Sequence, residues 1–160
     1  AVEARPADCC LVPESREELT TEGGLDVAGQ VDRISAACDQ LEAAGIRTSL
    51  FIDPEREQLD ASRVCGARVV ELHTGTYADA TDSEAETREL ARIATAADYG
   101  AKLGLRIHAG HGLHYHNVQP VAAISEIVEL NIGHSIVARA VFGGLASAVA
   151  DMRTLMYQAR

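Results

Sequence analysis

The chain has 160 residues, of which 47% are hydrophobic and 24% charged, and its formal net charge is −10. The negative charge argues against a nucleic acid or an anionic membrane surface as partner, because both bind basic patches, and no apolar run reaches the roughly 18 to 20 residues of a transmembrane helix. Small phosphorylated ligands remain compatible with it, since backbone amides bind phosphate whatever the net charge of the chain.

Short apolar runs rich in β-formers alternate with stretches of helical periodicity. The sequence predicts strands at 8–13, 48–53, 68–75, 103–110 and 128–136. It predicts helices at 31–44, at 55–64, from 81–86 through Ala101, at 118–124 and at 144–158. The longest of these helices has two capping-box spacings at its start, Thr81 to Glu84 and Ser83 to Glu86. In the last helix we expect four side chains to face the core: Leu145, Val149, Met152 and Met156.

This alternation is typical of βαβ units and therefore of a parallel sheet. The sequence has neither a G-x-G-x-x-G turn nor a Walker A loop, which argues against a Rossmann or P-loop domain. Polar or glycine-rich groups instead follow several strands, and such groups at the carboxyl ends of strands suit a TIM (β/α)8 barrel. Since eight units usually take about 250 residues, we expect residues 1–160 to form a single α/β domain, the last five units of a barrel.

The cysteines and the start of the chain bear on its context. Cys9, Cys10, Cys38 and Cys65 show no C-x-x-C spacing, so we expect reduced thiols of a cytoplasmic protein. The chain opens AVEARPADCC, without an initiator Met or a signal-peptide pattern. This start indicates a fragment.

Four of the six histidines lie in the segment RIHAGHGLHYHN at 106–117. The helical i, i+4 pair of a zinc site does not occur there and no third or fourth ligand is fixed, so the spacing gives a metal site little support. His111 stands apart because Gly110 and Gly112 flank it just beyond a predicted strand, where an imidazole can transfer protons. An exposed loop histidine is the alternative.

Glu71 and His73 stand two residues apart in a predicted strand and would share one of its faces. A carboxylate in the apolar run RVVEL is costly unless it is paired or functional. Glu71 therefore either stabilises a developing cation, orients a histidine, or forms a structural ion pair with a partner that the sequence does not identify.

Two loops are candidates for substrate binding. TTEGG at 20–24 offers the Thr20 hydroxyl on a flexible backbone. In NIGH at 131–134 a strand ends just before a helical turn that begins at Ser135, so the amides of Gly133 and His134 would donate to a phosphate, as the last loops of TIM barrels do. A tight packing turn is the alternative for this second loop.

Taken together, these segments resemble the pyridoxine 5′-phosphate synthase family of vitamin B6 biosynthesis. The resemblance is carried by CCLVPESREELTTEGGLDVAGQ (9–30), SLFID (49–53), ELHTGTYADA (71–80), ELARIA (89–94), AGHGLHYHNV (109–118) and ELNIGHSIVARAV (129–141). The segments follow one order along essentially the whole chain, and TTEGGLDVAGQ, AGHGL-x-YHNV and ELNIGH form a specific combination.

The resemblance implies a (β/α)8 barrel that assembles as a homo-octamer and uses no metal or organic cofactor. It implies condensation of 1-deoxy-D-xylulose 5-phosphate with 3-amino-2-oxopropyl phosphate, closure of the pyridine ring to pyridoxine 5′-phosphate, and release of inorganic phosphate and water.

Residue roles follow from the same resemblance, position by position. Thr20 matches the threonine that holds deoxyxylulose phosphate, Glu71 the glutamate that stabilises the transition state, and His111 the proton donor. The binding site for the second substrate is matched by Gly112, Gly133 and His134. His73 is a second-tier candidate, because it shares a face with Glu71.

The first three strands of the family carry further substrate-binding and catalytic residues that no segment of this chain matches. We therefore expect the 160-residue chain alone to lack synthase activity, because five strands cannot close a barrel. Two other classes remain open: another phosphate-binding TIM-barrel enzyme of the aldolase or isomerase type, and a metal-dependent hydrolase built on the histidines. Lys102, the single lysine, lies near a predicted helix end, which counts against a Schiff-base aldolase.

Overall fold

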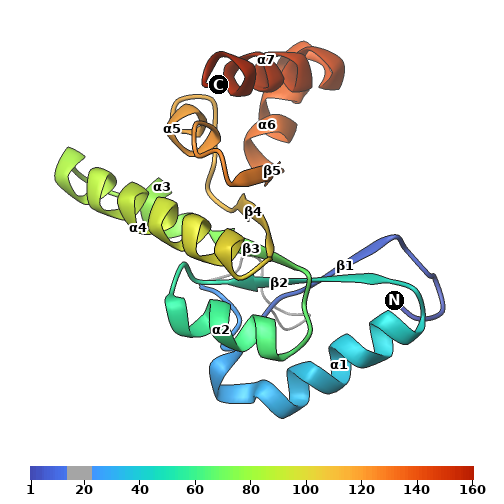
Figure 1. Ribbon diagram of the computed structural model, residues 1–160. Helices are drawn as coiled ribbons and strands as arrows, with labels where there is room; N and C mark the ends of the chain where they lie inside the picture. The colour runs from blue at the N-terminus through green and yellow to red at the C-terminus, as the bar shows by residue number, and fades with distance from the viewer. Residues whose placement is uncertain (14–22) are drawn as a thin grey trace.

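A computed structural model describes residues 1–13 and 23–160. Within these residues five parallel strands form one sheet, and their order in space equals their order in sequence. The strands are β1 (Asp8–Leu11), β2 (Arg47–Ile52), β3 (Val69–His73), β4 (Arg106–Gly110) and β5 (Ile127–Asn131). The colours of Figure 1 therefore change progressively across the sheet from β1 to β5, and the two ends of the chain lie at opposite ends of the molecule.

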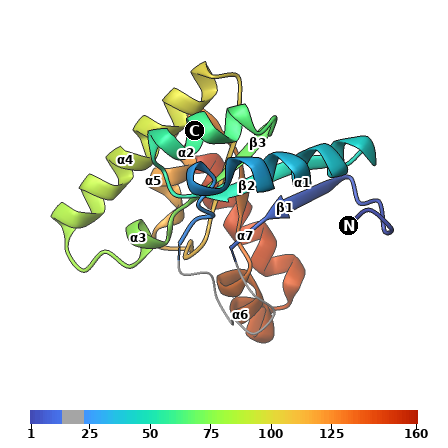
Figure 2. The same cartoon turned by 90° about the horizontal axis from the view of Figure 1, so that it is seen from below.

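Helices connect the strands. They are a 3-10 turn η1 (Ala28–Gln30), α1 (Val31–Ala43), α2 (Arg56–Val64), α3 (Gly75–Ala78), α4 (Ser83–Lys102), α5 (Val118–Ala122), α6 (His134–Gly143) and α7 (Leu145–Gln158). In Figures 1 and 2, α1 and α2 lie beside β1 and β2, α4 runs along β3 and β4, and α5 to α7 gather at the β5 end. This arrangement is an α/β sheet of the TIM-barrel type, which confirms the predicted fold class as a partial barrel.

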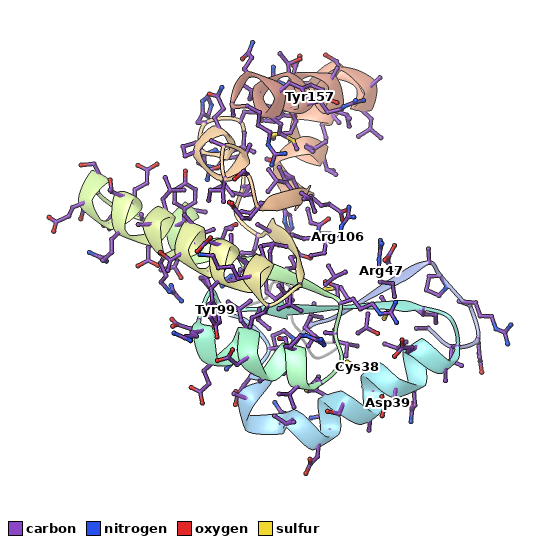
Figure 3. All side chains as sticks on the ribbon, in the orientation of Figure 1. Cys38, Asp39, Arg47, Tyr99, Arg106 and Tyr157 are labelled. Carbon is purple, nitrogen blue, oxygen red and sulfur yellow. The ribbon has the colours of Figure 1, made fainter. Side chains whose placement is uncertain are left out.

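The register of the strands sorts side chains onto two faces. Leu50, Val70, Ile107 and Ile127 are paired in one row across the sheet and are almost fully buried under the helices. Successive side chains alternate, so the next row, Phe51, Glu71 and His108, points the other way. A register shift between Ile107 and His108 breaks this regular pairing at β5 and brings Glu129 opposite His108. We call the face that carries this second row the open face. Figure 3 shows Arg47 and Arg106 on it, whereas Cys38 and Tyr99 belong to helices on the covered side.

Most element boundaries agree with the sequence, and two differences concern helix starts. The strand predicted at 128–136 ends at Asn131, because the backbone turns into α6 with Gly133 as N-cap. Neither Thr81 nor Ser83 caps α4. Asp82 does so, since its backbone is extended while Ser83 is already helical, and its carboxylate accepts a hydrogen bond from the Ala85 amide at 2.8 Å. That residues 1–160 form one domain, units four to eight of a barrel, stays a prediction.

The inward face of α7 agrees only in part with the prediction. Met152 is buried and Met156 half-buried as expected, but Leu145 and Val149 are 61% and 37% exposed, and Ala148 is buried. The Tyr115 hydroxyl donates to the carbonyl oxygen of Ala148 at 2.8 Å, which ties this turn of α7 to the loop after β4. A hydrophobicity pattern does not detect such a contact.

Candidate active site

The ends of the strands and the loops that follow them surround a cavity of about 490 Å³. Among the residues singled out in the sequence, this cavity is lined by Glu71, His111, Gly112, Gly133 and His134. His73 lines a neighbouring cavity, and His111 borders both cavities. Thr20 lies outside the described residues.

Glu71 projects from β3 onto the open face, and its carboxylate is partly buried. Asn131 of β5 donates Nδ2–H to Oε2 of Glu71 at 2.8 Å, and Sγ of Cys10 lies 3.8 Å from the same oxygen. Burial raises the pKa of the Glu71 carboxyl, although the hydrogen bond from Asn131 opposes the shift. Within residues 1–13 and 23–160, its hydrogen-bond partners are thus neutral groups and not the cation of a structural ion pair.

Gly110, the last residue of β4, makes room for this carboxylate. A Cβ atom at position 110 would lie 2.4 Å from Oε1 of Glu71 and 2.8 Å from the carbonyl oxygen of Asn131. Both distances are shorter than real contacts of a carbon atom. A side chain at this position would therefore displace Glu71 from its present place.

His111 is held on a backbone that a non-glycine residue rarely adopts, with φ at +83°. Such conformations cost about 1 to 3 kcal/mol and persist where surrounding bonds enforce them. Thr74 supplies those bonds: its hydroxyl lies 2.8 Å from the carbonyl oxygen of Gly110 and 2.5 Å from that of His111, and its amide donates to Gly110 at 2.9 Å. Strain stabilised in this way is common at functional sites.

Asp53 and His73 form a pair next to His111. Nδ1 of His73 lies 3.1 Å from Oδ1 of Asp53, and the His73 side chain is 8% exposed. The hydrogen bond from His73 lowers the pKa of the Asp53 carboxyl, and the backbone amide of Gly24 adds to this effect while burial opposes it. The ring of His73 lies 5.0 Å from that of His111 and meets Phe51 edge-on at 5.2 Å, measured between centroids.

The N-terminus of α6 borders the cavity with Gly133, His134 and Ser135. The first amides of a helix have no acceptor within it, and together with the helix dipole they favour an anion. The Ser135 hydroxyl donates to the carbonyl oxygen of Leu113 at 2.9 Å, which ties the start of the helix to the loop after β4. A helix start of this kind can bind an anion, and phosphate binding here stays a prediction.

The histidine-rich segment divides into separate environments. His108 is buried on β4, where Nδ1 lies 3.2 Å from Glu129 and Nε2 accepts a hydrogen bond from Arg106 at 3.1 Å. Burial lowers the pKa of His108, and the charge of Glu129 opposes this. The rings of His114 and His116 contact each other at 5.9 Å between centroids. In the part of the chain that the structure describes, no three His, Cys, Asp or Glu side chains are grouped to hold a metal ion.

Sequence reasoning gave no role to three neighbours of the predicted residues. Asn131 is the last residue of β5 and Asp53 directly follows β2, so both stand at the strand ends where function was expected. Cys10 offered no such signal, because its place beside Glu71 depends on the pairing of strands far apart in sequence. Loss of hydration, with the charge of Glu71 next, raises the pKa of Cys10 to about 12, so its thiol is neutral at pH 7.

Comparisons with known proteins agree with the resemblance seen in the sequence. Residues 1–158 match the family model described as pyridoxal phosphate biosynthesis protein PdxJ. The chain is 60% identical over all its 160 residues to a pyridoxine 5′-phosphate synthase of Photobacterium profundum, and 59% identical to one of Pseudoalteromonas translucida. It spans 66% of the length of each of these relatives. Within the described residues, no helix is both long and apolar enough to cross a bilayer.

Proposed function

Because this chain belongs to the family of the pyridoxal phosphate biosynthesis protein PdxJ, we propose that it is part of a pyridoxine 5′-phosphate synthase. The proposed reaction condenses 1-deoxy-D-xylulose 5-phosphate with 3-amino-2-oxopropyl phosphate to pyridoxine 5′-phosphate, inorganic phosphate and water. One observation carries the proposal: Glu71, His111 and the N-terminus of α6 converge on one cavity.

His111 supplies a proton in the proposed mechanism. The amine of one substrate forms an imine with the ketone of the other, and dehydration and ring closure follow, so protons move on and off carbon and oxygen at each step. A positioned imidazole contributes about 10²- to 10⁴-fold to such a step. The strained turn at His111, fixed by the Thr74 hydroxyl, supports this role because it orients the ring before the substrate arrives.

Glu71 stabilises the positive charge that develops on nitrogen during imine formation. Its carboxylate is poorly hydrated, and its described partners are an amide and a thiol. A cationic intermediate in the cavity would replace the hydration that Glu71 lacks, so the interaction strengthens as charge develops.

The two phosphorylated substrates take different places in the proposal. The amides at Gly133 and His134, together with Gly112, bind 3-amino-2-oxopropyl phosphate, and Thr20 holds deoxyxylulose phosphate. Acid–base groups carry the reaction without a metal or an organic cofactor. The complete enzyme is proposed to be a homo-octamer in the cytoplasm.

Incubating the purified protein, expressed from its full reading frame, with both substrates tests the function. We expect pyridoxine 5′-phosphate and an equal amount of inorganic phosphate, detected by chromatography and a phosphate assay. If neither product forms, the proposal is wrong. Cleavage of a single sugar phosphate would indicate an aldolase, and hydrolysis abolished by a chelator would indicate a metal-dependent hydrolase.

The 160-residue chain by itself gives a second result. We expect no turnover, because the edges of β1 and β5 are unpaired within the described sheet and the barrel is open. Product formation by this chain alone would contradict that expectation.

A further inference from the structure

We propose that Asp53 and His73 are positioning residues for His111: they fix its ring beside the cavity and supply the negative charge that favours its protonated form. This inference rests on the proposed function, in which His111 donates a proton. It assigns a task to a pair of side chains that the mechanism above does not use.

The contact geometry carries the first half of the proposal. The His73 ring is nearly fully buried and forms a triangle with the rings of Phe51 and His111, whose centroids lie 5.2 and 5.0 Å from it and 6.4 Å from each other. Nδ1 of His73 lies 3.1 Å from Oδ1 of Asp53, and because a carboxylate only accepts hydrogen bonds, Nδ1 carries the proton of this one. A ring held at one side by Asp53 and at another by Phe51 is a fixed surface for His111 to pack against.

Gly75 shows how closely the two histidine rings approach a common point. A Cβ atom on Gly75 would lie 2.5 Å from Nε2 of His73 and 3.1 Å from Cδ2 of His111. Nε2 of His73 is buried and has no hydrogen-bond partner among the described residues. An unsatisfied buried acceptor is costly, so its retention beside His111 is unexpected for a side chain with a packing role alone.

The second half of the proposal, that the pair favours protonated His111, rests on the negative charge of Asp53. The carboxyl pKa of Asp53 is lowered, so Asp53 carries a negative charge at pH 7 against the buried His73 ring, while its own side chain is 40% exposed and water partly screens the charge. A nearby negative charge favours imidazolium over imidazole. Since a proton donor must be protonated when its step begins, the pair keeps His111 ready at neutral pH.

Other titratable groups also face His111. The larger cavity is lined by Cys10, Glu71, His114 and His134. The neighbouring cavity is lined by His73, Asp79, Arg88 and Glu89. Asp79 is an exposed carboxylate in the second group with no described bond to His73, so it serves as a matched control for removing a negative charge near His111.

Gly24 is a second residue that holds Asp53. Its amide hydrogen-bonds the Asp53 carboxylate, and a Cβ atom on Gly24 would lie 2.1 Å from the Asp53 backbone nitrogen. The backbone of Gly24 therefore packs directly on the end of β2. Asp53 is restrained from both sides, as a residue that sets the position of others must be.

The experiment compares Asp53→Asn, His73→Phe and the control Asp79→Asn in the protein expressed from its full reading frame. In both test variants we expect kcat near pH 7 to fall by up to about tenfold. Asp53→Asn removes the charge and should move the pH above which kcat falls down by about one unit, whereas His73→Phe keeps that charge and should act through the lost support of the His111 ring. KM should change less than kcat, Asp53→Glu should recover part of the loss, and the double variant should lose no more than either single one. Asp79→Asn should leave the pH profile in place.

A histidine NMR titration of the same variants reads the proton affinity of His111 without catalysis. Failure of the wild-type protein to make product would contradict the proposed function, while the titration would still decide this inference. A pKa of His111 that is the same in wild type and Asp53→Asn overturns it. So does a shift of equal size in Asp79→Asn, or a rise in KM with an unchanged kcat profile.

Discussion

Glu71 and Glu129 lie in the same row of the same sheet, on either side of His108, yet their surroundings differ. Glu129 belongs to a charged cluster in which it pairs with His108, Arg106 bonds the same ring, and Arg47 pairs with Asp8. Glu71 belongs to a cavity cluster with Asn131 and His111, where its hydrogen-bond partner is an amide.

We infer from this difference that the charged cluster stabilises the fold and that the cavity cluster takes part in the reaction. Charges in the charged cluster are compensated by neighbours within the described residues, so they hold the open face together. The buried carboxylate of the cavity cluster has a raised pKa and meets a strained histidine turn, both of which cost stability. Residues that destabilise the empty protein in this way are candidates for contact with substrate.

The largest effect is expected for His111→Asn. Asparagine tolerates the positive φ of this turn, so the backbone should persist while the proton donor is lost. We expect kcat to fall by about 10²- to 10⁴-fold with a small change in KM, measured by steady-state kinetics with the full-length protein. An unchanged kcat would remove His111 from the mechanism.

Next is the matched pair Glu71→Gln and Glu129→Gln. Glu71→Gln should lower kcat by about 10²-fold and leave Tm equal or higher, because a carboxyl whose folded-state pKa is raised destabilises the fold at neutral pH. Glu129→Gln should do the reverse, lowering Tm with kcat kept, since His108 loses its partner. If both variants changed the same property, the distinction between the two clusters would be wrong.

A smaller effect concerns pH and the charged cluster. Burial lowers the pKa of His108 below its ordinary value of 6.5, so the unfolded chain takes up its proton at a higher pH than the folded one. The stability contributed by neutral His108 is therefore present above that value and is lost as pH falls. The Tm of the wild-type protein should therefore fall between about pH 7.5 and about pH 5.5, and the Tm of His108→Gln should fall less over the same range. Equal slopes would contradict the assignment.

The smallest effect lies outside both clusters. Asp82→Ala removes the cap of α4 and should cost about 1 kcal/mol of unfolding free energy, measured by urea titration, with kcat unchanged. This variant shows how kcat responds when only the stability of the fold is lowered. A simultaneous fall in kcat would show that the site responds to general destabilisation.

Sequence patterns predicted the strands and most helices because burial repeats with a local period. They also placed Glu71, His111 and Gly133 together, since the ends of parallel strands meet at one edge. The bond from Asn131 to Glu71 and the contact of His73 with His111 could not be predicted, because they depend on register and ring packing between distant segments. The exposure of Leu145 was missed as well, because a hydrophobicity pattern does not show which face of α7 meets the rest of the fold.

The strand order has a consequence for how the chain folds. Each described strand pairs with the strand that precedes it in sequence, as Asp8 with Arg47 and Ser49 with Val69. Each described pairing closes over a single strand–helix unit, so no strand has to wait for a distant part of the chain, and the entropy cost of closure grows only slowly with the length of the connection. The sheet can grow one strand at a time as the chain leaves the ribosome, and the cavity residues come together as the last described strand docks.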